Sequence, residues 1–269
     1  MGRTGRRAQE RKRKNTIVIG LLGCVVVAAG GAMAYVALTT SEGIDPVTLC
    51  PNTGPTSHTI VLVDKSDPMS FTQRKDFDVV YEEIIRKRVP KGGLLSVYAL
   101  EEDFKDNADP VAERCNPGDG SDVDIKTGNP ERARKIFKEK YLDPMVGVAD
   151  DLTTDRRGKA SPIFEMLQLV SIGFRKHDVR GERELIVFSD MLHNTPGFSM
   201  YKDKRLPKFS EFAESSYGAR AMTDLQGAKV ELQILMHTPQ LQKKELAYFW
   251  EEYVYKAKGK VTAVNAIKG

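Results

Sequence analysis

A long uncharged segment near the N-terminus constrains this chain most. It runs from Thr16 to Thr39 and contains neither a charged residue nor a proline. About 20 apolar residues, each rising about 1.5 Å along a helix, are enough to cross the hydrocarbon core of a bilayer. The segment therefore predicts one transmembrane helix over residues 16–39.

The charges around this segment predict its orientation. The whole chain has a formal net charge of +4, but residues 1–15 hold 7 Lys or Arg against the single acid Glu10, so the rest is slightly acidic. A basic cluster before a membrane helix stays in the cytoplasm. We therefore expect an inner-membrane protein with a short cytoplasmic tail, whose domain after Thr40 is periplasmic or extracellular. A slightly acidic body does not predict nucleic-acid binding.

Two other interpretations of the N-terminal segment stay open. Ala32, Met33 and Ala34 have the small-x-small form of a signal-peptidase site, although the apolar run continues beyond them. Residues 21–24 resemble a bacterial lipoprotein box ending at Cys24, but apolar residues follow where a polar linker is expected. An uncleaved anchor is the interpretation that fits the whole segment.

Cys50 and Cys115 are the two cysteines outside the apolar segment. An even pair in an oxidising compartment predicts one disulfide, with two unpaired thiols as the alternative. A zinc site is not expected, because the two cysteines show no ligand spacing with the four scattered histidines. Those histidines are His58, His177, His193 and His237.

Apolar runs and amphipathic stretches alternate through the rest of the chain. After a linker at 40–56, apolar runs predict strands at 58–64, 94–100, 184–190, 229–236 and 260–266. Amphipathic patterns predict helices at 71–89, 130–150, from Ser161 (as N-cap) to about 174, 210–217 and 239–257. Residues 101–129 are expected to form a loop insertion. This order predicts an α/β domain over 57–269, a doubly wound and mostly parallel sheet with helices on both faces.

Polar side chains follow the predicted strands where ligands bind in such a sheet, beyond the carboxyl ends. They are Asp64, which ends the first strand, Ser66 and Asp67 just after it, Ser161 before a helix, and Asp190, which ends a middle strand. Their order resembles the von Willebrand factor type A (vWA) family over about residues 55–265. That family holds a divalent cation with a D-x-S-x-S loop, a Thr and a later Asp. Here Pro68 replaces the second Ser of the loop, Ser161 replaces the Thr, and Met191 replaces the Gly that usually follows the Asp.

These residue types suit a hard cation. Mg²⁺ takes oxygen ligands in near-octahedral geometry and keeps several waters. The resemblance thus implies Mg²⁺ or Mn²⁺ held by Asp64, Ser66, Ser161 and Asp190, with Asp67 placed to compensate for the lost Ser. An acidic side chain of a partner protein would fill the open position. The alternative is that the carboxylates accept hydrogen bonds in turns at strand ends and that Ser161 caps its helix.

Enzyme signatures are weak. A phosphoryl-transferring D-x-D loop would need a carboxylate at position 66, and no P-loop occurs. A hydrolase could use Ser66 or Ser189 with His193, but neither serine lies in a G-x-S-x-G turn. We therefore expect a binding or adaptor domain in an envelope protein assembly, not an enzyme; a metal-free structural component, or a hydrolase using the edge at Asp64 and Asp190, is the alternative. Aromatic residues of the last helix could add a docking patch.

Overall fold

The computed structural model describes residues 23–33, 43–100, 109–126, 128–154, 158–177, 179–202 and 206–269. The chain divides into two units between Gly43 and Ile44. In the first unit, residues 23–33 are helical and solvent-exposed. Within the described ranges, no helix combines the length and apolar character needed to cross a bilayer. The tail at 1–15 and residues 16–22 and 34–39 of the predicted transmembrane helix lie outside the described residues.

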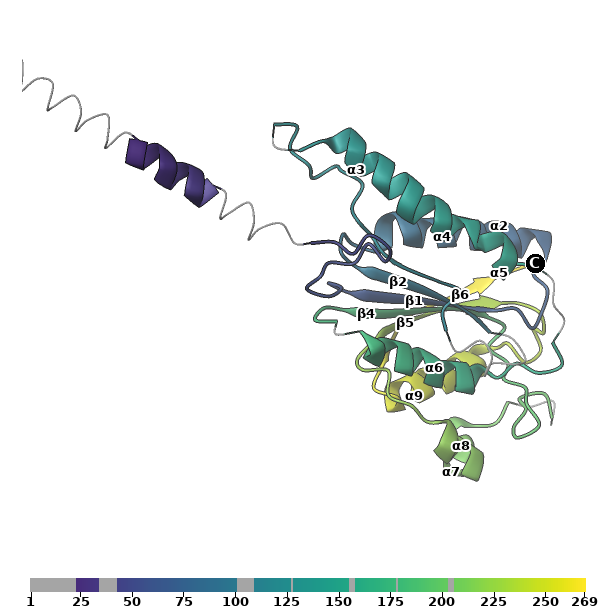
Figure 1. The fold of residues 1–269 in the computed structure, drawn as a ribbon. Coiled ribbons are helices and arrows are strands. Elements are labelled where there is room, and N and C mark those ends of the chain that lie inside the picture. The colour runs from purple at the N-terminus through teal and green to yellow at the C-terminus, as the bar shows by residue number, and fades with distance from the viewer. Residues whose placement is uncertain are drawn as a thin grey trace, which may run out of the picture. The chain divides into compact units, whose positions relative to one another are not determined.

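The second unit is built on a six-stranded sheet with the order β3-β2-β1-β4-β5-β6 (Figure 1). All neighbouring strands are parallel except β2 and β3. The prediction of an α/β domain with a mostly parallel sheet is confirmed. The strands are β1 (His58–Asp64), β2 (Leu94–Leu100), β3 (Ala112–Cys115), β4 (Arg183–Ser189), β5 (Lys229–Leu235) and β6 (Lys260–Ile267).

Helices cover both faces of the sheet, with one group on each side in Figure 1. One group contains α2 (Phe71–Glu83), its π-helical continuation η1 (Ile84–Arg88), α3 (Pro130–Ile136), η2 (Phe137–Leu142), α4 (Asp143–Gly147) and α5 (Ala149–Leu152). The other contains α6 (Ile163–Lys176), α7 (Phe209–Glu214), α8 (Ser216–Ala221) and α9 (Lys244–Lys256). Every residue of β1 and β2 is consequently buried, which explains why their sequences are nearly continuous apolar runs.

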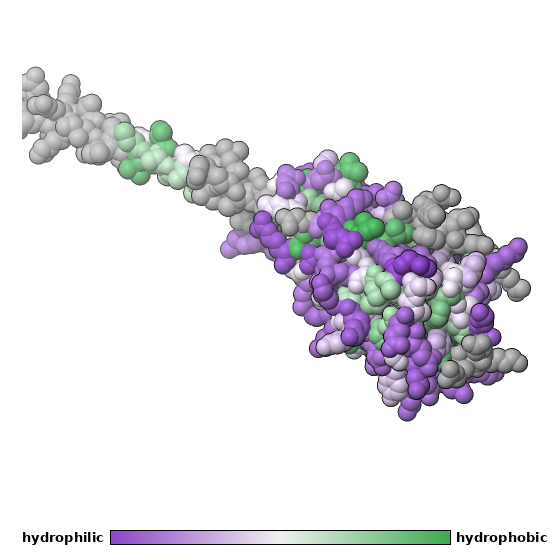
Figure 2. Space-filling model, turned by 90° about the horizontal axis from the view of Figure 1, so that it is seen from below, coloured by the Kyte–Doolittle hydropathy of each residue, from purple (hydrophilic) through white to green (hydrophobic). Residues whose placement is uncertain are grey.

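The aromatic residues of α9 divide between core and surface. Phe249, Trp250 and Tyr253 are buried in the cluster that joins the sheet to α6. Tyr248 and Tyr255 are exposed. Figure 2, which views this side of the molecule, shows mostly hydrophilic residues with small apolar areas between them. Most of the aromatic cluster is therefore core, and the exposed remainder is small.

Two local predictions are wrong. Residues 112–115, expected within a loop, form β3, which pairs antiparallel with β2. This four-residue strand includes Glu113 and Arg114 and lacks the apolar run that revealed the others. Ser161 does not cap α6, because Pro162 holds the N-cap position and the Ser161 hydroxyl is used elsewhere. The predicted cap of Asn129 with Pro130 at the start of α3 is confirmed.

Cys50 and Cys115 form a disulfide, as predicted. Cys115 also donates its backbone N–H to Thr48 O at 2.8 Å. Leu49 is buried, and residues 44–56, expected to be part of a linker, belong to the compact unit. The disulfide thus ties the segment before β1 to edge strand β3, a strand too short to bury much surface itself.

Candidate functional site

Three loops meet at the carboxyl edge of the sheet because β1, β4 and β5 are adjacent and parallel. The first begins at Asp64, the last residue of β1, and continues through Ser66 and Asp67. Asp190 directly follows β4, and His237 lies two residues after β5. Side chains far apart in the sequence are therefore brought to one place by strand order alone.

Asp64 is the centre of a buried hydrogen-bond network. Its Oδ2 accepts hydrogen bonds from Ser161 Oγ at 3.0 Å and from Ser189 Oγ at 2.7 Å. Its Oδ1 accepts the backbone N–H of Ser66 at 2.9 Å. Burial raises the pKa of Asp64, while the hydrogen bonds from its neighbours lower it and so favour the charged form. Both carboxylate oxygens thus already have donors, and Asp64 joins the β1 and β4 loops to the start of α6.

Asp190 lies beside this network and is also buried. Its Oδ1 accepts the backbone N–H of Leu192 at 2.8 Å, and its Oδ2 accepts the Tyr201 hydroxyl at 2.8 Å. Burial, and then the nearby Asp64 charge, raise the pKa of Asp190 to about 8. A positively charged ligand would stabilise the ionised forms of these two crowded carboxyl groups.

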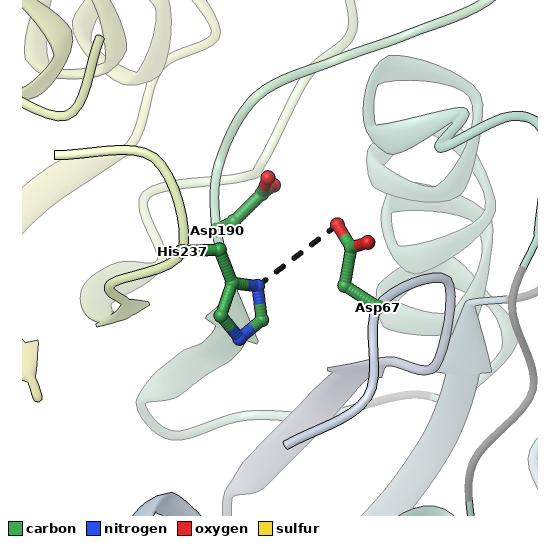
Figure 3. A group of neighbouring side chains, drawn as sticks. All are labelled: Asp67, Asp190 and His237. Atoms are coloured by element: carbon green, nitrogen blue, oxygen red, sulfur yellow. Dashed lines mark ion pairs between the residues drawn. The ribbon is translucent and has the colours of Figure 1, made fainter. Parts of the chain in front are cut away.

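Asp190 also belongs to a second group with Asp67 and His237. One ligand atom from each of the three residues lies within 4.8 Å of the other two. His237 Nδ1 lies 4.0 Å from Asp67 Oδ2, too far for a hydrogen bond. Figure 3 shows the Nδ1 edge of the ring turned toward the Asp67 carboxylate, with the Asp190 carboxylate beside them. This group offers two carboxylates and one imidazole nitrogen as metal ligands.

Two buried glutamines hold the loops around this group. Gln242 Oε1 accepts the backbone N–H groups of His237 at 2.8 Å and Thr238 at 2.7 Å. Its Nε2 donates to Asp190 O at 2.9 Å and Leu235 O at 2.7 Å. One side chain therefore links the β4 loop to the β5 loop. Gln73 on α2 contacts the His237 ring, with 3.2 Å between Gln73 Oε1 and His237 Nε2.

A hollow of about 240 Å³ opens beside the two groups. Ser66, Asp67, Ser161 and Tyr201 are among its lining residues. Ser66 is only 6% exposed, and within the described ranges its hydroxyl forms no hydrogen bond of good geometry, although its closeness to Asp64 helps to lower the pKa of that carboxyl group. A buried hydroxyl without a well-formed hydrogen bond is uncommon in folded proteins, so this oxygen is available to a ligand or to water.

All of the metal-ligand residues expected from the sequence lie at this edge, but in two groups. Asp64 and Ser161 are hydrogen-bonded to each other, whereas Asp67 faces His237 and Asp190. Sequence reasoning did not place Tyr201 or His237 at this edge, and it considered Ser189 only as a hydrolase nucleophile. Ser189 was identifiable as a site residue because it directly precedes Asp190 at the end of a predicted strand. His237 was identifiable only by noting that a third predicted strand, at 229–236, also ends just before a possible ligand.

The serine and histidine considered for a hydrolase do not pair. Ser189 donates to Asp64, and His193 contacts the hydroxyls of Thr195 at 3.2 Å and Tyr217 at 2.9 Å instead. His193 is fully buried. Burial lowers the pKa of His193 to about 3, so its ring stays neutral within an aromatic cluster that includes Phe164.

No protein-family model matches this chain, and a search of curated proteins gives no match.

Proposed function

We propose that this chain is a membrane-anchored binding protein whose α/β domain, similar to vWA domains, binds another protein at the carboxyl edge of its sheet. In this proposal residues 16–39 anchor the chain in the inner membrane, and the domain acts in an envelope assembly on the far side. The disulfide between Cys50 and Cys115 supports an oxidising compartment, since such bonds are rare in reducing ones.

One observation carries the proposal: carboxylates and hydroxyls from three loops converge beside a hollow at the functional edge of a parallel sheet. A divalent cation at Asp190, supported by neighbouring oxygens, would leave coordination positions open toward solvent. An acidic side chain of the partner would complete the coordination of Mg²⁺ or Mn²⁺. The role of such an edge in binding rests on analogy with the family, whereas the position of the residues comes from this chain.

The test uses the full-length chain in mild detergent. Mg²⁺ or Mn²⁺ should raise its melting temperature, because a ligand that binds only the folded state stabilises that state. Asp190→Ala should abolish this response and should also abolish chelator-sensitive capture of a partner from membranes. Asp76→Ala, at an exposed carboxylate on α2, is the matched control and should change neither. Chelator-sensitive capture that survives Asp190→Ala would contradict the proposal.

A metal-free binding domain is a second candidate, favoured by a specific observation. Both Asp64 oxygens already accept hydrogen bonds, and burial raises the pKa values of Asp64 and Asp190. A protonated Asp190 beside the hydrogen-bonded Asp64 would stabilise this edge without a cation. In that case the partner would bind equally well in chelator, and the melting temperature would not respond to either ion.

A further inference from the structure

We propose that Asp67, Asp190 and His237 bind a transition-metal dication, Mn²⁺ or Zn²⁺, in preference to Mg²⁺. The inference rests on the proposed function only in placing a cation at the carboxyl edge. It assigns a ligand set that includes a nitrogen atom and excludes Asp64 and Ser161. It therefore names both the position and the chemical class of the ion.

The spacing of the three ligands is close to that of an occupied site. Bonds of about 2.1 Å to a common ion separate two ligand atoms by about 3.0 Å at a right angle and by about 4.2 Å when they lie opposite each other. The 4.0 Å between His237 Nδ1 and Asp67 Oδ2 falls between these values. A carboxylate oxygen of Asp190 lies within 4.8 Å of both. Side-chain adjustments of less than about 1 Å would bring all three to bonding distance.

Hydrogen bonding sets the tautomer of His237 in the form that a metal requires. Gln73 Oε1 is an acceptor, and it already accepts the backbone N–H of Ser70 at 2.9 Å. His237 Nε2 must therefore donate to this oxygen, which leaves the lone pair of the neutral ring on Nδ1. Nδ1 is buried and has no hydrogen-bond partner in the part of the chain that the structure describes. Metal-bound histidines commonly donate their other ring nitrogen to a fixed acceptor in this way.

The backbone beneath the ligands is also fixed in advance. Gln242 connects His237 N–H to Asp190 O through its side-chain amide, so the two ligand loops keep their separation. Tyr201 donates to Asp190 Oδ2 and orients that carboxylate. The hydroxyl of Ser66 lies in the same hollow as Asp67, where it can contact a metal-bound water. Little ordering is then needed when the ion binds.

The donor set decides the class of ion. Mg²⁺ takes oxygen ligands almost exclusively and releases its waters reluctantly. An imidazole nitrogen suits Zn²⁺ and other first-row transition metals, and mixed carboxylate and imidazole sites also suit Mn²⁺. Two carboxylates and one neutral imidazole would cancel the charge of a dication. The bound dication would in turn offset the repulsion between Asp67 and the buried Asp190.

Calorimetric titration of the chelator-treated full chain in detergent tests the proposal. We expect one Mn²⁺ or Zn²⁺ per chain, with Mg²⁺ weaker by more than about tenfold. His237→Gln should weaken Mn²⁺ binding by more than about tenfold, since even the loss of an outer-shell partner typically costs about 10–100-fold. Ser161→Ala, at the other ligand group, should leave the affinity nearly unchanged. His177→Gln, at a partly exposed histidine on the far edge, controls for adventitious Zn²⁺ binding.

A spectroscopic measurement gives an independent readout. Pulsed electron paramagnetic resonance of bound Mn²⁺ should detect a coordinated nitrogen in the parent chain and in Ser161→Ala, but not in His237→Gln. Stoichiometric Mg²⁺ binding that is indifferent to His237 would overturn the inference while leaving the proposed function intact. Absence of stoichiometric binding by any dication would also overturn it. Partner capture in chelator would then decide between the cation-dependent and metal-free forms of the proposed function.

Discussion

Gln242 offers the sharpest test of how the site is held together. Its side chain is 8% exposed and forms four hydrogen bonds, all with backbone groups of the β4 and β5 loops or the end of β5. Gln242→Leu keeps the bulk of the side chain and removes every one of these bonds. The four backbone groups must then find water or remain unpaired in a largely buried place.

The magnitude follows from these contacts. A typical intramolecular hydrogen bond contributes about 1 kcal/mol net, and a buried group left without a partner costs about 1–3 kcal/mol. Water can reach part of this loop, because His237 and Thr238 are only half-buried. The four losses should therefore not add fully. We expect Gln242→Leu to lower the free energy of unfolding by about 2–4 kcal/mol.

Urea unfolding of residues 44–269, which form a compact unit, measures this change. Trp250 is the single tryptophan and is a local reporter, because its Nε1 donates to Met191 O at 2.8 Å in the loop that follows Asp190. Gln240→Leu, two residues away at an exposed position, is the matched control and should stay within about 0.5 kcal/mol of the parent. Equal stability of the two variants would refute the assignment of Gln242 as the clamp between the loops.

Three further predictions concern the domain as a whole. Replacing Cys50 and Cys115 together with Ser should lower the free energy of unfolding by about 2–4 kcal/mol, and an unchanged urea midpoint would contradict this. Burial raises the pKa of Asp190 from 3.8 to about 8, so between these pH values the folded chain retains a proton that the unfolded chain loses. In the presence of chelator, the free energy of unfolding should therefore fall as the pH rises from about 4 to 8, by at most about 1.4 kcal/mol per pH unit. Asp190→Asn should flatten that slope. Phe164→Ala, in the centre of the aromatic cluster, should cost about 3–5 kcal/mol, whereas Phe71→Ala, at a 75% exposed ring, should cost little in the same urea assay.

The sequence predicted those elements whose pattern comes from burial on both faces. The apolar runs of β1 and β4 occur because helices cover both sides of the sheet, and the adjacent carboxylates mark the carboxyl end of each apolar run. Strand β3 has no such apolar run, since it is a short edge strand paired on one side only. Its position depends on the disulfide and on the β2 edge, which are tertiary features rather than local ones.

The site was predicted in part for the same reason. Asp64 ends one clear strand and Asp190 comes directly after another, so the two residues meet once β1 and β4 are neighbours. The participation of His237 depends on β5 lying beside β4 and on Gln73 turning the ring. Neither fact is visible in the spacing of histidines along the chain. Ligand spacing identifies sites built within one segment, and this group is assembled from three.

The division of the edge into two groups allows the loop after β1 to contribute to the proposed cation site through Asp67 while Asp64 holds the loops together. Both carboxylate oxygens of Asp64 accept hydrogen bonds, from the Ser66 N–H and from two serine hydroxyls. These hydrogen bonds fix the loops. Pro68 has no hydroxyl to contribute on that side, while Asp67 lies toward His237 on the opposite side. Asp190 borders both groups, so its substitution cannot tell them apart. Ser161 and His237 each belong to one group, and the pair of variants at these positions assigns the ion to one side of Asp190 or the other.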